Sequence, residues 1–398
     1  MLCYNDQRIL AGRVEYIMTI RLYDQDSSIL AFKACVTGCE EKKGQYYVTL
    51  DRTAFFPEGG GQGADHGVLG DVHVMDCHEV HGEVVHTTDA PLEVGLEVEG
   101  RVDAVRRLDM MQQHSGEHIF SGLVHQLFGY DNVGFHIGSE AVTMDFSGPL
   151  TQEDITRVEL LANEIIWKNV PVQTLLPSPE ELEAMTYRSK KALAGEVRIV
   201  NIPGADTCAC CGTHVKYTGS IGQIKVIGWQ KYKVGVRVSI LCGRRALAEE
   251  NIIMDQAYRS AVALSAKQHE LSLSVERLMA ERDGLRAKCD ALGMRIFEML
   301  CVEEEKNAIR VVACDALSAG AVRKAAGRLC AGARMGLVLM ARDDGWNFAL
   351  SSENEDVRPA TRALCAAFGG KGGGPKDMTQ GVLTSGTVEE IRRTLGEL

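Results

Sequence analysis

Short β-branched runs separated by glycine and charged turns mark the first quarter of the chain. Residues 1–95 contain runs such as Tyr46–Leu50 and Val84–Thr87. Runs of this kind are typical of strands. The stretch Phe55–Gln62 holds a proline and three adjacent glycines, which cannot continue a strand interior and indicate a loop. We therefore predict a small antiparallel β domain over residues 1–95 that carries this glycine-rich loop.

The pattern becomes helical from about Val102. Apolar residues recur there at spacings of three and four, and Thr151–Asp154 has the composition of a helix start. Apolar runs at Val197–Ile202 and Ile224–Ile240 indicate that strands follow. Residues 96–248 are therefore expected to form a mixed α+β domain.

Residues 249–306 are expected to form a helical connector. Thirteen positions between Ala257 and Met299 alternate spacings of three and four, and eleven of them are apolar, which is the pattern of a coiled coil. One continuous helix of this length would span roughly 60 Å. Two interpretations remain open. The helix pairs with a second copy or acts as a spacer, or the segment is a helix hairpin that turns at Asp283–Gly284 or Leu292–Gly293.

An α/β module is predicted for residues 307–398, because strand-like apolar runs alternate there with helical stretches. The predicted strands begin at Ile309, Met335 and Trp346, and a helix is expected over Val357–Phe368. A second glycine cluster, Gly369–Gly374, follows that helix. The fold class predicted for the chain is thus α+β, with a small β domain, a central α+β domain, a helical connector and a C-terminal α/β domain.

Composition limits the functions that the chain can have. It holds 398 residues, and its 43 basic and 54 acidic side chains give a net charge of −11, so an RNA partner would have to contact local basic patches. No stretch approaches the twenty or so consecutive apolar residues of a membrane-spanning helix. The sequence from Met1 to Gln7 lacks a secretory profile. We expect a cytoplasmic protein without a membrane partner, whose thirteen cysteines stay reduced.

Two pairs of residues indicate one metal site. His114 and His118 are four apart in a predicted helix and project from the same face, and Cys210 and His214 repeat this spacing nearly a hundred residues later. Imidazole nitrogens and a thiolate suit tetrahedral zinc better than magnesium or calcium, which prefer oxygen ligands. Either pair alone would be weak evidence, but together in one predicted domain they indicate Zn²⁺.

The segment His114–His118 also fits the H-x-x-E-H signature of a metallopeptidase, in which Glu117 would act as general base. Such an enzyme needs a carboxylate as its third ligand. It also leaves Cys210, His214 and the first glycine-rich loop without a role. The metallopeptidase is therefore kept only as an alternative.

Several motifs together resemble one known family. Phe55–Gln62 resembles its F-Y-P-E-G-G-G-Q motif, His114–His118 its HxxxH, and Cys210–Thr218 its C-G-G-T-H followed by threonine and glycine. The family is that of the alanyl-tRNA synthetase editing domain and its free-standing AlaX-type relatives. Gly369–Gln380 is similar to the glycine-rich signature of the DHH-associated domain at the synthetase C-terminus, so the resemblance covers essentially the whole chain, as in the long AlaX-type proteins. The chain departs from the family pattern at Cys211, which stands in place of the first glycine.

This resemblance implies a zinc-dependent hydrolase that deacylates mischarged tRNA(Ala), above all tRNA(Ala) carrying serine. A pocket built for a small apolar amino acid rejects an added hydroxyl by only about a hundredfold, so a second, hydrolytic site has to correct the error. By motif, the zinc ligands would be His114, His118, Cys210 and His214, although Cys208 and Cys211 leave the choice of thiol open. A non-catalytic, zinc-containing tRNA-binding protein is a further alternative.

Candidate substrate contacts lie near these motifs. Thr53 and Gln62, beside the first glycine-rich loop, are candidates for contact with the serine hydroxyl or the terminal adenosine; the alternative is an ordinary strand residue and a loop-stabilising amide. Asn132 and Gly134 belong to a segment that resembles the lining of the amino-acid pocket in this family. No residue is identified as the catalytic base.

The second glycine cluster is a candidate RNA contact. Its exposed backbone amides, together with Lys371 and Lys376, are expected to bind tRNA phosphates. The alternative is a simple turn after a helix that Gly369 caps. The partner implied is therefore tRNA(Ala), bound at its acceptor end and possibly its elbow, with a homodimer through the helical connector as a further expectation.

Overall fold

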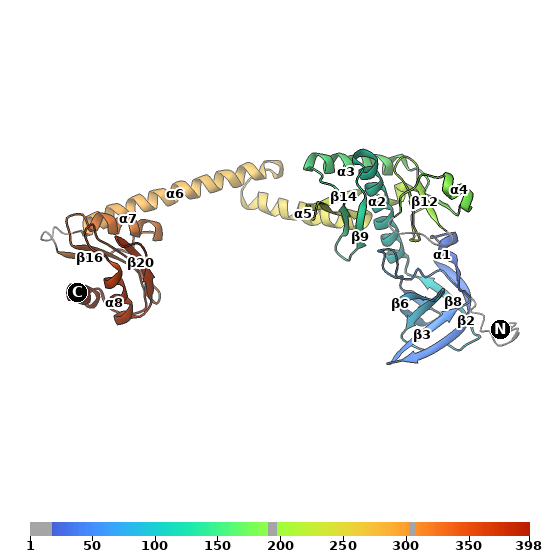
Figure 1. Cartoon of the computed structure of the whole chain (residues 1–398), viewed down its shortest axis with the longest axis horizontal. Helices are drawn as coiled ribbons and strands as arrows, with labels where there is room; N and C mark the ends of the chain where they lie inside the picture. The colour runs from blue at the N-terminus through green and yellow to red at the C-terminus, as the bar shows by residue number, and fades with distance from the viewer. Residues whose placement is uncertain (1–17, 190–196, 302–307) are drawn as a thin grey trace. The chain divides into compact units, whose positions relative to one another are not determined.

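The computed structural model describes residues 18–189, 197–301 and 308–398. Its contacts divide the chain into two compact units, with the division between Asp255 and Gln256, and each unit is described by itself. Both contain helices and sheets, so the predicted α+β class is confirmed (Figure 1). Among the described residues, every helix is too short or too polar to cross a lipid bilayer.

The first unit begins with a closed antiparallel barrel, in the order β2-β3-β7-β6-β5-β8. Alternate residues of its strands, such as Val36 and Val48, are buried inside. The predicted antiparallel strands are confirmed. The sequence analysis did not predict that they close into a barrel. The strands are β2 (Ala31–Lys42), β3 (Gln45–Leu50), β5 (Gly67–Leu69), β6 (Val72–Val80), β7 (Glu83–Thr88) and β8 (Glu97–Val102), and a short parallel pair, β1 (Ile20–Arg21) and β4 (Arg52–Thr53), lies with helix α1 (Leu22–Gln25) beside them.

The glycine-rich stretch is a loop, as predicted, and one of its glycines permits a close contact. Phe55 and Phe56 at its start are buried, so the loop is fixed to the barrel. Gly61 has φ +86°, and a Cβ there would lie 2.6 Å from the ring of Phe135. A side chain at Gly61 would therefore push the loop away from the strand that carries Phe135.

The central helix α2 (Ala104–Phe128) is almost entirely buried along its middle. Asp103 caps its start by accepting hydrogen bonds from the amides of Val105 and Arg106. The fully buried Arg107 forms an ion pair with Asp65 and donates to the carbonyl of Ala54, next to the glycine-rich loop. These contacts attach the first turn of α2 to the barrel.

Two sheets and a second helix surround α2. Helix α3 (Gln152–Lys168) starts at a capping box of Thr151 and Asp154, as the sequence predicts. A four-stranded sheet has the order β14-β15-β10-β9, and a three-stranded sheet has the order β11-β12-β13. Their strands are β9 (Asn132–Ile137), β10 (Val142–Phe146), β14 (Ile224–Tyr232), β15 (Gly235–Cys242), β11 (Gln173–Leu175), β12 (Ile199–Ile202) and β13 (Asp206–Ala209), accompanied by helix α4 (Pro179–Ala184) and the 3₁₀ turn η1 (Thr218–Ile221).

The segment Ala257–Met299 is largely helical, but the interpretation of it as one continuous helix is wrong. The structure has two helices, α5 (Gly243–Ala263) and α6 (Leu271–Leu300), with a 3₁₀ turn η2 (Gln268–Glu270) before the second. Ser265 adopts φ +50°, and the amide of Ala266 bonds to the carbonyl of Ala261, which is the hydrogen bond that closes a Schellman motif. The predicted hairpin turns are also wrong, because Gly284 and Gly293 lie inside α6.

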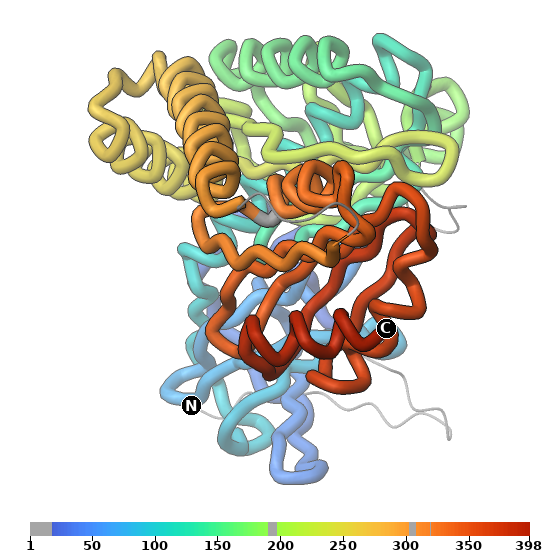
Figure 2. The backbone as a smooth tube through the Cα atoms, turned by 90° about the vertical axis from the view of Figure 1, so that its left-hand side faces the viewer, coloured from blue at the N-terminus to red at the C-terminus, as the bar shows by residue number. Residues whose placement is uncertain are grey.

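The C-terminal sheet of the second unit has the order β16-β17-β18-β20-β19. Helix α7 lies on one face of this sheet and α8 on the other (Figures 1 and 2). Along β17, Leu337 and Leu339 belong to the core that also contains residues of α8 and α9, whereas Val338 packs with residues of α7 and the end of α6. The predicted α/β alternation is confirmed. The elements are β16 (Ile309–Ala313), α7 (Ala319–Leu329), β17 (Met335–Arg342), β18 (Gly345–Ser351), α8 (Arg358–Phe368), β19 (Lys371–Gly373), β20 (Met378–Leu383) and α9 (Val388–Gly396).

Candidate metal centre

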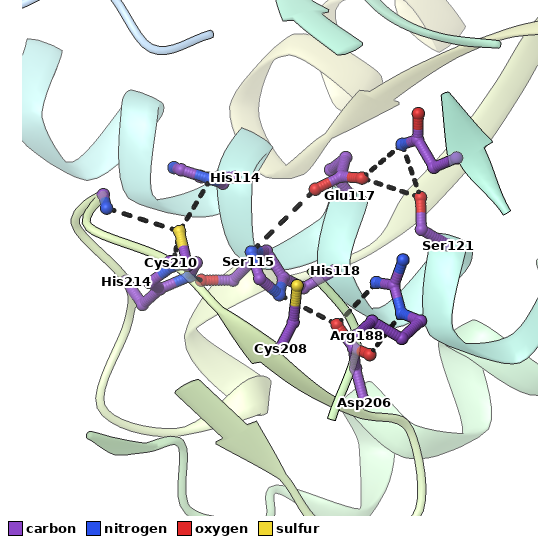
Figure 3. A network of polar contacts seen from close by, with 12 residues as sticks. His114, Ser115, Glu117, His118, Ser121, Arg188, Asp206, Cys208, Cys210 and His214 are labelled. Atoms are coloured by element: carbon purple, nitrogen blue, oxygen red, sulfur yellow. Dashed lines mark hydrogen bonds and ion pairs between the residues drawn. The ribbon is translucent and has the colours of Figure 1, made fainter. Parts of the chain in front are cut away.

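The four residues predicted to bind metal meet at one point. His114 and His118 project from α2, and Cys210 and His214 come from the turn after β13 (Figure 3). One donor atom from each of the four lies within 4.8 Å of the others. The Cys210 Sγ is 3.4 Å from the Nε2 atoms of both His114 and His214. All three imidazoles are at least 95% buried, since their exposed fractions are 1%, 1% and 5%.

Each imidazole is held by its other nitrogen. The Nδ1 of His114 is 2.8 Å from the Gln62 Oε1, and the Nδ1 of His118 is 2.9 Å from the Asp206 Oδ2. Both partners are acceptors, so each Nδ1 carries a proton and Nε2 is the nitrogen that faces the cluster. The Nδ1 of His214 lies 3.2 Å from the Ser115 hydroxyl. Ligating histidines in proteins are oriented in this way by acceptors behind them.

The thiol of Cys210 is prepared as a thiolate. Burial opposes ionisation, but the neighbouring His114 and His118 outweigh it and hold the pKa of Cys210 well below its usual value. The amide of Gly212 donates to the sulfur at 3.3 Å. Three imidazole nitrogens and one thiolate, all directed at the same point, form a donor set that fits tetrahedral zinc.

Arg198 fixes the turn that carries this thiolate. Its Nη1 donates to the carbonyls of Cys210 and Gly212, both at 2.9 Å, and its own carbonyl accepts from the Cys210 amide at 3.0 Å. Gly212 must be glycine, because a Cβ there would lie 2.1 Å from the His114 Cε1. Arg198 and Gly212 together define where the thiol lies.

The two neighbouring thiols differ from Cys210 in position. Cys208 is buried beside His118 and Asp206, with which it forms a second group of possible donors. Cys211 is exposed. The group that also contains His114 and His214 includes Cys210 alone of the three thiols.

Asp206 and Arg188 form a buried support for His118. The guanidinium of Arg188 donates to both carboxylate oxygens of Asp206, each at 2.7 Å. Burial raises the pKa of Asp206, but His118 and Arg188 outweigh this effect and lower it, so the carboxylate stays charged. No spacing rule in the sequence connects these two residues to α2, and sequence analysis missed both.

Glu117 and Asn132 connect α2 to β9. The Oε1 of the fully buried Glu117 accepts from the Ser121 hydroxyl at 2.7 Å and from the Asn132 side-chain amide at 2.6 Å, and its Oε2 lies 4.0 Å from the His118 Nε2. The third donor beside the two α2 histidines is thus the thiol of Cys210 and not the carboxylate that a metallopeptidase needs.

Phe135, on the same strand as Asn132, forms one wall of the metal centre. Its ring lies 5.2 Å from that of His114, centroid to centroid. Gly134, the neighbouring candidate, faces Asp145 instead, since a Cβ there would lie 3.0 Å from the Asp145 carboxylate. Sequence analysis named the segment that contains Phe135 but chose Asn132 and Gly134 as its candidates, whereas Phe135 is the residue in it that contacts a ring of the candidate metal centre.

The other predicted substrate residues lie in different places. Gln62 is 1% exposed and bonds to His114 and to the Thr213 hydroxyl, so it supports the metal centre. Thr53 is fully buried in the barrel, where its hydroxyl lies 2.8 Å from the Nε2 of His86 and accepts from the Phe55 amide.

Lys371 and Lys376 lie in the second unit and are exposed. Lys371 begins β19, an edge strand whose amides partly pair with β20. Gly372 faces Gly381 across this pair, and a Cβ on Gly372 would lie 2.7 Å from the ring of Phe348. Part of the glycine cluster is therefore required by packing, while the outer edge of β19 stays unpaired within the described chain.

A cleft of about 510 Å³ lies beside the metal centre, and we call it the side cleft. Gly59 and Gly60 of the glycine-rich loop, together with Arg198 and Cys211, form one side of it. It is completed by Met18, Thr19, Arg21, Tyr23, Asp24, Gln25, Phe56, Pro57, Glu58, Glu79 and Leu176. Both loops that support the metal centre thus continue into this cleft.

Comparison with known proteins gives three domain matches. Residues 19–106 match the family described as tRNA synthetases class II (A), and residues 197–239 match the Threonyl and Alanyl tRNA synthetase second additional domain. Residues 306–398 match the DHHA1 domain. The second match contains Arg198, Cys210 and His214, so it covers half of the metal centre.

Whole-chain relatives agree with these matches. The chain is 27% identical to the alanyl-tRNA editing protein AlaX-L of Pyrococcus horikoshii over 388 residues, covering 92% of the chain and 94% of the relative. It is 31% identical to the alanyl-tRNA editing protein Aarsd1 of Danio rerio over 278 residues, covering 64% and 68%. It is also 32% identical over 397 residues to the alanine–tRNA ligase of Thermofilum pendens, where it covers 92% of the chain but 42% of the ligase. The chain spans 40%, 42% and 32% of the length of three alanine–tRNA ligases that it matches.

Proposed function

Since this chain belongs to the family of alanyl-tRNA editing proteins, which is related to the alanyl-tRNA synthetases, we propose that it is a cytoplasmic hydrolase that removes wrongly attached amino acids from tRNA(Ala). Ester hydrolysis requires a positioned water and stabilisation of the charge that develops on the carbonyl oxygen. The buried donor cluster beside an open cleft supports this proposal. The proposed ester hydrolysis depends on this one observation, the buried donor cluster.

Zinc is the metal proposed for this cluster. His114, His118, Cys210 and His214 would hold it, and when bound it would supply a Lewis acid that polarises a carbonyl or a water. The protein contributes the orientation of these ligands. Gln62, Asp206 and Ser115 fix the three imidazoles from behind, so their Nε2 atoms already point at the cluster.

The surroundings of the cluster limit access of water. Phe135 covers one face of His114, and the glycine-rich loop packs directly on Phe135 at Gly61. Glu117 and Asn132 fix the start of β9 to α2, so this wall is held at a constant distance from the histidines. Cys210 is partly exposed, so a substrate can approach the cluster from its side.

Serine is the amino acid that we propose is removed. A synthetic pocket made for alanine rejects the extra hydroxyl of serine poorly, whereas a site that offers hydrogen bonds to the hydroxyl discriminates strongly against a substrate that lacks it. Thr53, Gln62, Asn132 and Gly134 stay proposed contacts for the substrate. In the described structure the first three have their polar side-chain groups engaged with other residues, so a direct contact would require one of these bonds to exchange.

Binding of the tRNA body is proposed for the second unit. Lys371 and Lys376 are exposed at the glycine cluster, and the unpaired outer edge of β19 offers backbone amides beside them. Such a surface suits phosphate oxygens. We also propose that a second copy of the chain covers the apolar residues of α6. Leu278, Leu285 and Leu292 recur every seven residues and are 51%, 53% and 56% exposed.

A paired deacylation assay tests the proposed function. Zinc-loaded full-length protein is incubated with tRNA(Ala) carrying serine or alanine, and the remaining ester is measured over time. We expect the serine ester to be lost and the alanine ester to be spared. His118→Ala should reduce the rate to that of spontaneous hydrolysis, while His136→Ala, at an exposed histidine of β9, should leave it unchanged.

One specific observation favours a second candidate function. Four protein donors resemble a closed structural zinc site, because catalytic sites keep a position open for water or substrate. A zinc-containing protein that binds tRNA without hydrolysing it would have the same cluster. The paired assay separates the two functions, since binding of tRNA(Ala) without loss of either ester would support the second and contradict the first.

A further inference from the structure

The side cleft lies next to the residues that carry the candidate metal centre. Cys211, in its wall, directly follows the proposed ligand Cys210, and Gly60 directly precedes the residues that contact Phe135 and His114. Arg198 lines the cleft and also holds the carbonyls of Cys210 and Gly212. An ester at the metal centre would thus bring its attached nucleoside to the mouth of this cleft.

The charges that line the cleft are unsuited to phosphate. Three carboxylates, those of Asp24, Glu58 and Glu79, face two guanidinium groups, those of Arg21 and Arg198. Arg21 is engaged with Glu79 at 2.8 Å, and Arg198 is engaged with backbone carbonyls. The uncompensated charge is therefore negative, and it disfavours the sugar–phosphate backbone.

Among the described residues that line this cleft, Asp24 is the partly buried carboxylate that lacks a partner, whereas the equally unpaired Glu58 is exposed. Within the part of the chain that the structure describes, the Asp24 carboxylate makes neither a hydrogen bond nor an ion pair, although it is only partly exposed. Burial raises the pKa of Asp24, against the effect of Arg198 and Arg21. A partly desolvated carboxylate gains most from a ligand that offers it an N–H donor.

The remaining lining suits a flat, uncharged group. Tyr23 and Phe56 pack edge to face at 5.4 Å and are only 3% and 4% exposed, so most of the apolar surface is offered by Met18 and Leu176, which are 63% and 71% exposed. Apolar side chains of this kind cover the faces of a nucleobase. The volume of about 510 Å³ also lies in the range of roughly 300–1,000 Å³ that small-molecule sites occupy.

We propose that the side cleft binds the terminal adenine of the tRNA, and that the Asp24 carboxylate accepts a hydrogen bond from its exocyclic amine. This inference rests on the proposed function, because it assumes that the ester is presented at the metal centre. The terminal nucleoside is the part of the tRNA that fits, since no phosphate follows it, its base is uncharged, and adenine carries an amine donor.

Binding of non-hydrolysable analogues tests this assignment without turnover. The probes are acceptor-stem RNA hairpins whose 3′ end carries serine through an amide, terminating either in adenosine or in purine riboside, which lacks the amine. Wild-type full-length protein is expected to bind the adenosine hairpin about tenfold more tightly, as for a hydrogen bond to a charged acceptor. Asp24→Ala should lose this preference and bind both hairpins as wild type binds the purine hairpin.

The matched control is Asp71→Ala, at an exposed carboxylate in the turn before β6, which should keep the full tenfold preference. Asp24→Asn, whose amide oxygen can still accept, should keep part of it. Equal binding of the two hairpins by wild type, or an undiminished preference in Asp24→Ala, would overturn the proposal. The proposal would also be overturned if wild type bound a 3′-phosphorylated hairpin more tightly than the adenosine hairpin, because phosphate would then be the group that the cleft accepts.

Failure of this inference is distinguishable from failure of the proposed function. The corresponding seryl esters are assayed in parallel for hydrolysis. If wild type cleaves the ester but shows no preference for adenosine, the adenine site is wrong and the editing activity stands. If the preference is present but the ester survives, the adenine site stands and the hydrolase is wrong.

Discussion

Asp206→Asn is the substitution that probes most sharply how the metal centre is held. The Asp206 carboxylate accepts from the His118 Nδ1 at 2.9 Å and pairs with Arg188 through two bonds of 2.7 Å, and its side chain is 2% exposed. Asparagine keeps the size and leaves one oxygen that can accept from His118. The variant therefore removes the charge and preserves most of the packing.

The magnitude follows from the change of acceptor. A hydrogen bond to a charged group contributes about 1.5–3 kcal/mol, and one between neutral groups about 1 kcal/mol. The loss of about 1.4 kcal/mol would weaken zinc binding about tenfold, which is at the lower end of the effects known for residues behind metal ligands. Zinc affinity is measured by competition with a chromophoric chelator at constant pH.

Asp145→Asn is the matched control for this experiment. Asp145 also accepts two bonds from one arginine, Arg237, at 2.6 and 2.7 Å, and it is 9% exposed. These two bonds do not involve a histidine of the candidate metal centre. Its substitution should leave zinc affinity unchanged. Zinc affinity of Asp206→Asn within twofold of wild type would refute the reasoning that His118 binds metal through Nε2 with its Nδ1 held by a carboxylate.

Four further outcomes are expected. Gly212→Ala would place a Cβ 2.1 Å from a metal-binding imidazole and should weaken zinc binding at least tenfold by chelator competition, whereas Gly228→Ala, where a Cβ meets nothing within 4 Å, should not. Burial lowers the pKa of His86 from 6.5 to about 4, so the unfolded chain takes up the proton first and the free energy of unfolding falls as the pH drops from 6.5 to 4. His86→Gln should remove about 3 kcal/mol of this pH dependence, measured by urea unfolding. An equal pH dependence in both proteins would contradict the burial argument. Lys371→Ala should reduce the salt dependence of tRNA binding by about one counterion, and an unchanged slope would exclude a phosphate contact. Leu285→Lys should convert a dimer to a monomer in light scattering, and a wild-type protein that is already monomeric would end the proposal of pairing through α6.

The fold was predictable wherever local chemistry decides it. The capping box at Thr151 and Asp154, the loop at the three glycines and the strands of the C-terminal sheet follow from neighbours in sequence. The break between α5 and α6 could not be predicted, because the heptad pattern of apolar residues continues through it. Ser265 ends α5 with a positive φ that no sequence rule for serine indicates.

The sequence was enough to predict the four proposed ligands of the candidate metal centre, but not the residues that support them. Four donors at a spacing of four residues, in two pairs, contain enough information to bring them together. Their supports come from distant segments and carry no pattern: Asp206 and Arg198 are charged residues near strands, and either would normally be assigned to the surface. Gln62 was found for its position beside the loop, although in the structure it contacts His114 and Thr213.

Cobalt substitution tests most directly the claim that these four side chains hold one metal ion. The metal-free full-length protein is titrated with Co²⁺, and the near-ultraviolet charge-transfer band of a thiolate bound to cobalt is followed. We expect saturation at one equivalent, loss of the band in Cys210→Ser, and its retention in Cys208→Ser and Cys211→Ser. A band that survives in Cys210→Ser and disappears in either neighbour would contradict the account.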